Sequence, residues 1–281
     1  MKELNRRKFI GISAAVLAST ALSMSGVAIA DSGSALDAIR RSKVLRIGVV
    51  ADGEPNFHKD HVTGEWSGIY IDFAKRLATA MGVELKLHET TWGNAILDLQ
   101  SSKIDVFFGL NPTPQRKLVI DFTDPLYDNA YSMIARKSFT GKTWGDLNQP
   151  NVTIAVDVGS SYDNLVTKMC PNAKIMRFET SSAATMAVQT DKADVQPLVI
   201  TLAAGTVRKN PDIGKLVVPQ PVMLTSSCAG VRKGDDKALL NYINSWLKTV
   251  HQGNTVRDIV YSNLDHLMGV KVADMPSIVK F

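Results

Sequence analysis

Apolar and polar residues follow the same order in two passes along the chain. In residues 45–109, apolar runs typical of buried strands alternate with stretches of helical spacing. Phe73, Leu77 and Met81 recur at that spacing and mark the buried face of one helix. Residues 152–197 repeat the order of strand, helix, strand, helix and strand. Such alternation predicts parallel sheets covered on both faces, so we expect an α/β fold with two lobes.

The remaining pattern completes these lobes. It predicts a strand at 131–136, a loop at 138–150, a helix at 200–209, strands near 215–218 and 228–232, and helices at 236–251 and 255–263. The tail to residue 281 has no clear periodicity. We expect the chain to cross between lobes near 127–129 and 221–227, which would act as a hinge. The predicted lobes are then 31–128 with 226–281, and 129–225.

The first thirty residues read as an export signal and not as part of the fold. Arg6 and Arg7 precede an apolar run and a small-x-small cleavage site at 28–30, so cleavage after Ala30 is expected. The residues around the arginines resemble the twin-arginine export motif, but Asn5 stands where Ser or Thr is usual, and a general secretory leader stays open. Both routes lead out of the cytoplasm, and we expect a periplasmic protein.

The composition argues against one class of partner. Removal of the leader, with four basic residues and one acidic residue, lowers the formal net charge from +5 to +2. The remaining chain has no run of lysines or arginines interleaved with aromatic residues. Nucleic-acid binding needs such a basic surface, so no nucleic-acid partner is expected.

The chain has two cysteines, Cys170 and Cys228. In an oxidising compartment they could form one disulfide or remain two buried thiols. Because the predicted lobes separate the two residues, a bridge would restrict the hinge. That consideration favours thiols.

Residues 105–128 carry the strongest functional signal. A buried strand runs into a turn marked by prolines, and the turn brings Arg116 to a helix start. Helix N-termini present unpaired N–H groups, and a guanidinium is a planar fork that matches carboxylate oxygens, so we interpret the segment as a carboxylate clamp. In the alternative interpretation, Arg116 caps the turn or pairs with Asp121 or Asp124 on the surface.

The loops that follow the predicted strands define a candidate cleft. In open α/β sheets, ligands bind beyond the carboxyl ends of the strands, so two facing lobes place their loops around one cleft. The candidate loops are 50–57, 90–92, 109–116 and 157–161. In the last of these, Ser160 or Ser161 could cap a helix and leave N–H groups for an anion, although the cap alone is a sufficient explanation.

With these motifs, the chain resembles the periplasmic solute-binding proteins of ABC importers, of the polar amino acid type. The resemblance depends on LRIGVV, WSGIYIDFAKRLA, LQSSKIDVFFGLNPTPQRKLVIDFTDPLYD, VDVGSS, KADV and AGVRKGD. It implies a type II clamshell, in which two lobes with mostly parallel sheets flanked by helices are joined by a two-strand hinge. It also implies capture of a small carboxylate-bearing solute, an amino acid or a derivative, and delivery to an ABC permease in the inner membrane. We expect a monomer without a cofactor.

The resemblance assigns roles to residues of the cleft. It implies that Arg116 grips the α-carboxylate of the ligand, and that Gly109 and Asn111 contact the ligand beside it. Ser160 and Ser161 match the turn that completes the carboxylate site from the second lobe.

The resemblance also leaves one charge unexplained. Trp92 is expected to pack against the side chain of the ligand. Val199, in contrast, stands where the family has an aspartate that binds the α-ammonium of the ligand. An unpaired buried charge costs roughly 3–5 kcal/mol. Asp157, Glu54 and the neighbouring Asp52 are candidates to replace the missing carboxylate. We therefore expect a ligand that carries its positive charge in an unusual place or carries none.

Other functions remain open. A few relatives of this fold are enzymes such as dehydratases, and Glu54 beside Asp52 is the obvious candidate acid, which would need a raised pKa. A solvated loop is the simpler interpretation, so no catalytic residue and no enzyme activity are expected. A ligand-sensing receptor could use the same clamshell. His58 and His61 alone do not complete a metal site, and no metal is expected.

Overall fold

The computed structural model of the chain describes residues 34–275. The predicted leader and its cleavage site after Ala30 lie outside the described residues. Within 34–275, no helix is both long enough and apolar enough to cross a membrane.

The first pass has the predicted order of elements. It consists of α1 (Ala35–Ser42), β1 (Val44–Val49), β2 (His58–Lys59), β3 (Trp66–Ser67), α2 (Ile69–Met81), β4 (Glu84–Glu89), α3 (Ala95–Gln100), β5 (Val106–Leu110) and α4 (Pro114–Val119). β1 pairs in parallel with β4 and β5, as expected for alternating strands and helices. Periodicity does not predict α1 or the β2–β3 hairpin, because two-residue strands and an eight-residue helix carry too few repeats.

The rest of the chain keeps the predicted order of elements, but the strand predicted at 131–136 is part of a longer strand that begins at Ile120. It consists of β6 (Ile120–Ala135), α5 (Trp144–Leu147), β7 (Thr153–Asp157), α6 (Ser161–Met169), β8 (Lys174–Phe178), α7 (Ser181–Gln189), β9 (Val195–Val199), α8 (Ile200–Lys209), β10 (Lys215–Val217), β11 (Leu224–Arg232), α9 (Ala238–Val250), α10 (Thr255–Met268) and the 3₁₀ helix η1 (Val272–Asp274). The short helix α5 lies in the predicted loop at 138–150. Helix α10 runs beyond its predicted end at 263, to a left-handed Gly269.

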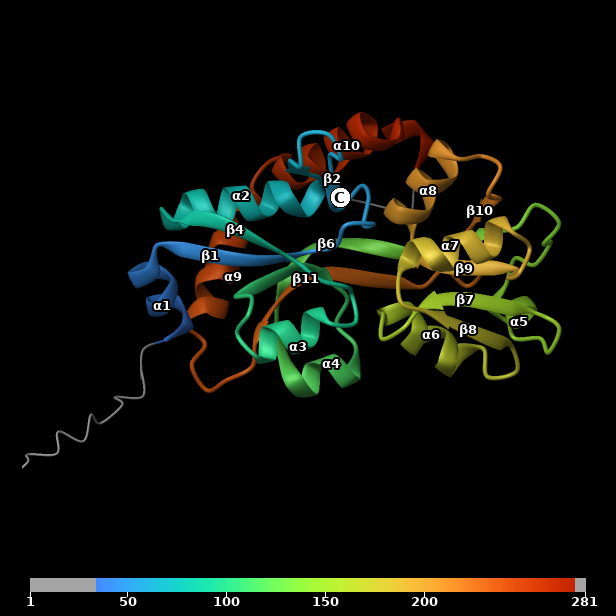
Figure 1. The fold of residues 1–281 in the computed structure, drawn as a ribbon, viewed down its shortest axis with the longest axis horizontal. Helices are drawn as coiled ribbons and strands as arrows, with labels where there is room; N and C mark the ends of the chain where they lie inside the picture. The colour runs from blue at the N-terminus through green and yellow to red at the C-terminus, as the bar shows by residue number, and fades with distance from the viewer. Residues whose placement is uncertain (1–33, 276–281) are drawn as a thin grey trace, which may run out of the picture. The chain divides into compact units, whose positions relative to one another are not determined.

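Two antiparallel strands connect the two halves of the fold (Figure 1). The described strands form a nine-stranded sheet in the order β4-β1-β5-β11-β6-β9-β7-β8, with β10 paired to β6. The first part of β6 pairs with β11, and its last part, from Tyr131, pairs with β9. The crossing predicted at 127–129 and 221–227 therefore coincides with a continuous strand, β6, and with the start of β11.

Buried apolar side chains form two separate clusters, one in each half. The first lobe contains Phe73, Phe107 and Phe108, which are fully buried around β1, β5 and α2. The second lobe is built on buried residues of β7 and β9, among them Ile154 and Val195. Helix α8 contributes side chains to both clusters. Two cores agree with two lobes, while the bounds of the lobes remain a prediction.

Both cysteines are buried free thiols. Cys170 ends α6 in the second lobe, and Cys228 lies in β11. Burial raises the pKa of Cys170 to about 11 and the pKa of Cys228 to about 12. The hinge therefore carries no covalent constraint from these residues.

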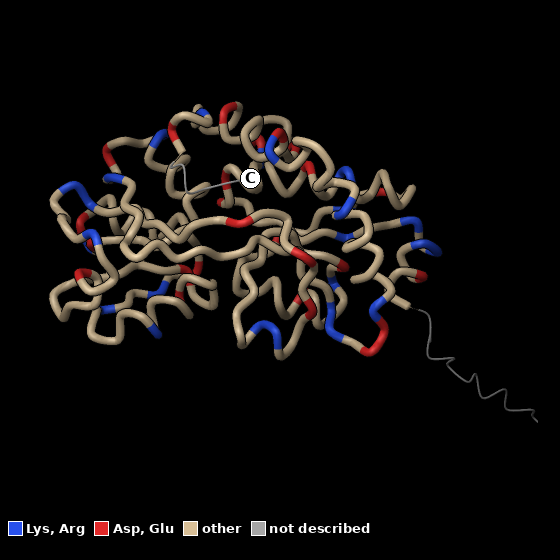
Figure 2. The backbone as a smooth tube through the Cα atoms, turned by 180° about the vertical axis from the view of Figure 1, so that it is seen from behind, with Lys and Arg blue, Asp and Glu red and all other residues tan. Residues whose placement is uncertain are grey.

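Charged residues of both signs are interspersed over the described backbone (Figure 2). Some ion pairs, such as Lys137 with Asp212, join two exposed side chains and contribute little to stability. Among residues 34–275, the buried charged side chains are those of Asp98, Arg116 and Asp157.

Candidate functional site

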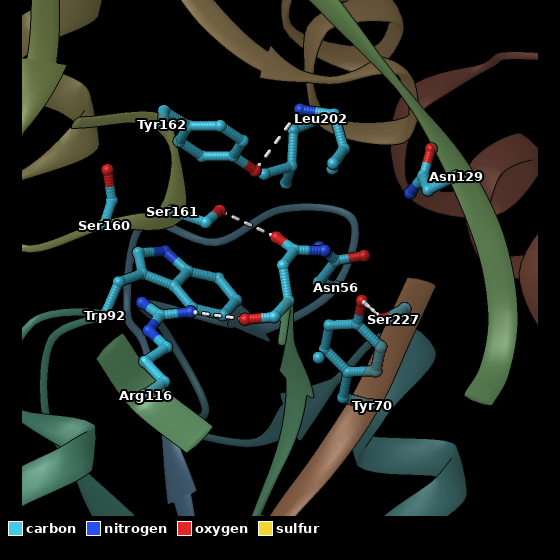
Figure 3. Close-up of a pocket in the computed structure, with 13 residues that line it drawn as sticks. Asn56, Tyr70, Trp92, Arg116, Asn129, Ser160, Ser161, Tyr162, Leu202 and Ser227 are labelled. Carbon is cyan, nitrogen blue, oxygen red and sulfur yellow. Dashed lines mark hydrogen bonds between the residues drawn. The ribbon is translucent and has the colours of Figure 1, made fainter. Parts of the chain in front are cut away.

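A small cavity lies where loops of both lobes meet β6 and β11 (Figure 3). Its volume is about 10 Å³, which is room for about one water molecule. Six of the nine predicted site residues line it, namely Trp92, Gly109, Asn111, Arg116, Ser160 and Ser161. The other three, Asp52, Glu54 and Asp157, do not.

The turn before Arg116 has the local structure that its sequence predicts. The hydroxyl of Thr113 accepts a hydrogen bond of 3.2 Å from the backbone N–H of Arg116 and caps α4. Pro114 occupies the first helical position, where its missing N–H is not needed. The cap and the proline hold the backbone, so the side chain of Arg116 points into the cavity, and only 6% of the residue is exposed.

The guanidinium of Arg116 spans the cleft. It donates to the backbone carbonyl of Asn111 at 3.2 Å, and from the first lobe it reaches the carbonyl of Gly159 in the second lobe at 3.3 Å. No carboxylate of residues 34–275 forms an ion pair with it. Asp121, one of the surface partners considered above, pairs with Lys237 instead.

Arg116 remains a cation in this environment. Burial lowers its pKa to about 10, and the nearby Tyr162, Tyr131 and Asp157 offset part of that effect. A pKa of about 10 keeps the guanidinium protonated at neutral pH. Backbone carbonyls satisfy two of its donors but do not neutralise it, so the cavity favours a small anion.

The second lobe contributes the two serines at the start of α6. The hydroxyl of Ser160 accepts from the N–H of Asp163 at 3.1 Å, which is the helix cap proposed as the structural alternative. The hydroxyl of Ser161 donates to the side-chain oxygen of Asn111 at 2.8 Å, across the cleft (Figure 3). Only the second contact joins the lobes, and a ligand oxygen could replace it.

Aromatic rings form one wall of the cavity. Trp92 packs against Phe57 and Phe107, with ring centroids 5.9 and 5.5 Å apart. Tyr70 lies so close to Gly109 that a Cβ at this glycine would be 2.0 Å from the tyrosine ring, and the glycine has a φ of 88°. Gly109 is therefore required by the packing of the wall, whether or not it contacts a ligand.

Asp52 and Glu54 line a second, larger pocket. Its volume is about 380 Å³, and it shares Trp92 and Leu202 with the small cavity. Asp52 accepts a hydrogen bond of 3.0 Å from the backbone N–H of Ser182 in the other lobe. Both candidates from the first loop thus lie beside the cavity of Arg116 and not in it.

Glu54 is held by two basic side chains. Its carboxylate contacts both His58 and Lys209. Burial raises the pKa of Glu54, but the hydrogen bonds and charges of Lys209 and His58 outweigh burial, so the pKa is lowered from its usual value. Glu54 therefore carries a negative charge at neutral pH and is a poor proton donor. The region provides no metal site, because no group of three or more metal-ligating side chains occurs in residues 34–275.

Asp157 is buried at the carboxyl end of β7, and only 3% of it is exposed. Neither carboxylate oxygen has a hydrogen-bond partner among the described residues. Burial, and to a smaller extent the charge of Asp52, raise the pKa of Asp157, which lies at about 6. The backbone N–H of Asp157, the charge of Arg116 and the hydroxyl of Ser160 lower the pKa by smaller amounts.

The sequence profile described as "Bacterial extracellular solute-binding proteins, family 3" matches residues 45–264. The chain belongs to this family. Membership confirms the resemblance inferred from the motifs and implies export. Proteins of this family have two lobes, and so do the solved structures that this chain matches.

Two curated relatives illustrate the range of family 3. The ABC transporter arginine-binding protein 1 of Escherichia coli (strain K12) is 26% identical over 208 residues, which are 73% of this chain and 84% of that protein. The cyclohexadienyl dehydratase of Pseudomonas aeruginosa is 24% identical over 227 residues, 80% of this chain and 84% of the enzyme. The relatives of this chain therefore include both a binding protein and an enzyme.

A solved structure of the family matches the fold over most of the chain. It is the ancestral amino acid-binding protein AncCDT-1, described as a precursor of cyclohexadienyl dehydratase. It is 31% identical, covers 83% of this chain and 100% of its own, and superposes with a TM-score of 0.74. The two-lobed α/β architecture predicted from the motifs is confirmed.

The cavity of this family 3 protein also contains residues that the motifs do not indicate. They are Asn56, Tyr70, Asn129, Tyr162, Leu202 and Ser227, beside Val199. Tyr162 directly follows the serine turn, and Asn129 and Ser227 lie in the predicted crossing segments. The positions of these three residues in the sequence could therefore have indicated them as cavity residues. Asn56 lies in the predicted cleft loop at 50–57, whereas Tyr70 and Leu202 lie in helices outside the predicted loops and have no such signal.

Proposed function

We propose that the protein is the extracytoplasmic receptor of an ABC importer, which binds an amino acid or a related small carboxylate between its lobes. The observation that carries this proposal is the guanidinium of Arg116, a buried cation that no carboxylate of residues 34–275 neutralises. A ligand carboxylate would match its planar donors and remove the unpaired charge. Family membership and amino-acid-binding relatives support the same function.

Binding requires the lobes to separate. A cavity of about 10 Å³ has no room for an amino acid. The contacts that hold this form closed across the cleft include hydrogen bonds from Arg116 to Gly159, from Ser161 to Asn111 and from Ser182 to Asp52, and the ion pair of Lys209 with Glu54. Each can break without disturbing a core. Bending of β6 and β11 would open the cleft, and the ligand would then take over the cross-cleft contacts on closure.

Delivery to a permease in the inner membrane follows from this function, since the closed form differs from the open form on the surface that a permease can contact. The leader pattern supports export to the periplasm with cleavage after Ala30. We propose that the receptor acts as a monomer, because each chain supplies both lobes of its cleft.

The proposed function involves no catalysis. A general acid in the cleft would need a raised pKa, and the pKa of Glu54 is lowered by its basic partners. The dehydratase among the relatives makes a direct test worthwhile. Incubation of the mature protein with a cyclohexadienyl substrate of that dehydratase, followed by chromatography, should reveal no dehydration product. Product formation that Glu54→Gln abolishes would favour the enzyme.

Calorimetric titration tests the carboxylate clamp. The mature protein is titrated with a panel of cationic, polar and apolar amino acids, and the best ligand is then measured with Arg116→Ala. Loss of one buried charged partner should weaken binding about 30-fold or more. Arg76→Ala is the matched control, since Arg76 is exposed on α2. Unchanged affinity in Arg116→Ala would refute the clamp.

Small-angle scattering tests the closure. The radius of gyration of the wild-type protein should fall when the best ligand is added in excess. Equal radii with and without ligand, at concentrations that calorimetry shows to be saturating, would contradict closure while leaving the clamp intact.

A further inference from the structure

Asp157 is a buried carboxylate that has no hydrogen-bond partner within residues 34–275. It is 3% exposed, and both oxygens lack a hydrogen bond among the described residues. Buried carboxylates in proteins are normally paired or strongly hydrogen-bonded, because an unpaired one loses its hydration without compensation. The helix beside it already has its cap in Ser160, so Asp157 is not needed there. A structural role does not explain this residue.

Arg116 and Asp157 are two buried groups of opposite charge that do not pair with each other. Burial dominates the pKa of each group, and the charge of the other group acts against burial in both cases: Asp157 raises the pKa of Arg116, and Arg116 lowers the pKa of Asp157. Even so, the two groups form no ion pair in the closed form, in which the guanidinium bonds only to backbone carbonyls. A protein that merely needed stability would pair them or replace both.

The lining of the cavity makes Asp157 the candidate for a ligand cation. Besides Arg116, every side chain that lines the cavity is uncharged, and Val199 supplies a methyl surface where the resemblance leads one to expect a carboxylate. Asp157 lies behind this lining. Burial raises the pKa of Tyr162, and the nearby charge of Asp157 adds to that rise; the hydroxyl of Tyr162 accepts a hydrogen bond from the backbone N–H of Val199. Of the acidic groups nearby, Asp52 and Glu54 already have partners.

Building on the proposed function, we propose that Asp157 binds the cationic group of the ligand. The receptor would then hold a zwitterion with its carboxylate on Arg116 and its cation on Asp157. The two contacts come from different lobes, since Arg116 is in α4 and Asp157 ends β7. Opening of the cleft exposes the end of β7, and closure on a zwitterion neutralises both buried groups at once. Asp157 thereby replaces the carboxylate missing at Val199.

The test uses probes that differ in charge. The mature protein is titrated with L-glutamine, which carries an α-ammonium, and with 4-carbamoylbutanoate, the same molecule without it. L-arginine and 5-guanidinopentanoate form a second pair, in which the deaminated probe keeps a distal cation. All four carry the carboxylate that Arg116 would bind, and each is measured with the wild-type protein and with Asp157→Asn.

Asp157→Asn should weaken the binding of every probe whose cation reaches this residue by about 30-fold or more. Binding of 4-carbamoylbutanoate should stay the same or improve, which also shows that the variant is folded. Loss for both L-glutamine and L-arginine, but not for 5-guanidinopentanoate, would assign the α-ammonium to Asp157. Loss for L-arginine and 5-guanidinopentanoate would assign the distal guanidinium. Asp212→Asn, an exposed carboxylate of the second lobe, is the control for the change in net charge.

Two results would overturn the assignment. One is a wild-type protein that binds 4-carbamoylbutanoate as tightly as the cationic probes, which would mean an anionic ligand. The other is an Asp157→Asn variant that binds all cationic probes with wild-type affinity. Neither result affects the proposed function, which fails separately if Arg116→Ala leaves the affinity for every probe unchanged.

Discussion

Replacement of Asp157 by asparagine should stabilise the ligand-free protein at neutral pH. The pKa of this carboxyl rises from 3.8 to about 6 on folding, because burial disfavours its charged form. Each unit of pKa difference corresponds to about 1.4 kcal/mol, so ionisation of Asp157 costs the native state roughly 3 kcal/mol at neutral pH. Asparagine does not ionise and avoids this cost.

Because the pKa of Asp157 is raised on folding, its carboxyl lowers the free energy of unfolding as the pH rises. Below pH 3.8, the carboxyl is protonated in both the native and the unfolded state, and it has no effect. Between pH 3.8 and about 6, the native state binds more protons than the unfolded state, so the free energy of unfolding falls as the pH rises. The loss is complete only about one pH unit above the folded pKa, at about pH 7.

Chemical denaturation of the wild-type protein and of Asp157→Asn at pH 4 and pH 7.5 measures this effect. The stability of the variant relative to the wild type should increase by roughly 2–3 kcal/mol between the two pH values. Because asparagine does not titrate, a constant cost of burying its amide cancels in this comparison. Asp212→Asn, with an exposed side chain, should show no such increase. A relative stability of Asp157→Asn that is equal at both pH values would refute the reasoning.

Other parts of the site allow further predictions. Gly109→Ala should lower the melting temperature by several degrees or more, because its Cβ would overlap the ring of Tyr70 at a positive φ, and an unchanged melting curve would contradict this packing. Ser161→Ala removes the hydroxyl that bonds to Asn111, so the ligand-free protein should become less compact in scattering. Cys228, with a pKa raised to about 12 by burial, should react with a thiol reagent only after denaturation, and fast labelling of the native protein would argue against burial.

The turn of Arg116 was predictable because its structure is encoded locally. Thr113 caps the helix, Pro114 starts it, and the arginine follows within one turn, so neighbouring residues determine where the side chain begins. The same holds for the serine turn before α6. The order of strands and helices in the two passes was predictable for a similar reason, since most of their elements show their own period, whereas α1 and the β2–β3 hairpin do not.

The environment of the acidic residues was not predictable, because it depends on elements far apart in the chain. Glu54 meets Lys209 at the end of α8, and Asp52 meets Ser182 at the start of α7. These contacts place both residues in the larger pocket. The lack of a partner for Asp157 is still harder to infer, because it requires knowing every group that packs around the carboxylate.

The positions of Arg116 and Asp157 relate ligand choice to closure. Under the proposed assignment, a ligand with only a carboxylate neutralises one buried charge and leaves the other unpaired in the second lobe. A zwitterion bonds to both lobes, so its interaction energy is larger in the closed state than in the open state, and only such a difference can shift the equilibrium between them. A matching amino acid would therefore bind more tightly and would also be the ligand that closes the receptor. The same two side chains would thus decide which solute is bound and which complex a permease meets in the closed form.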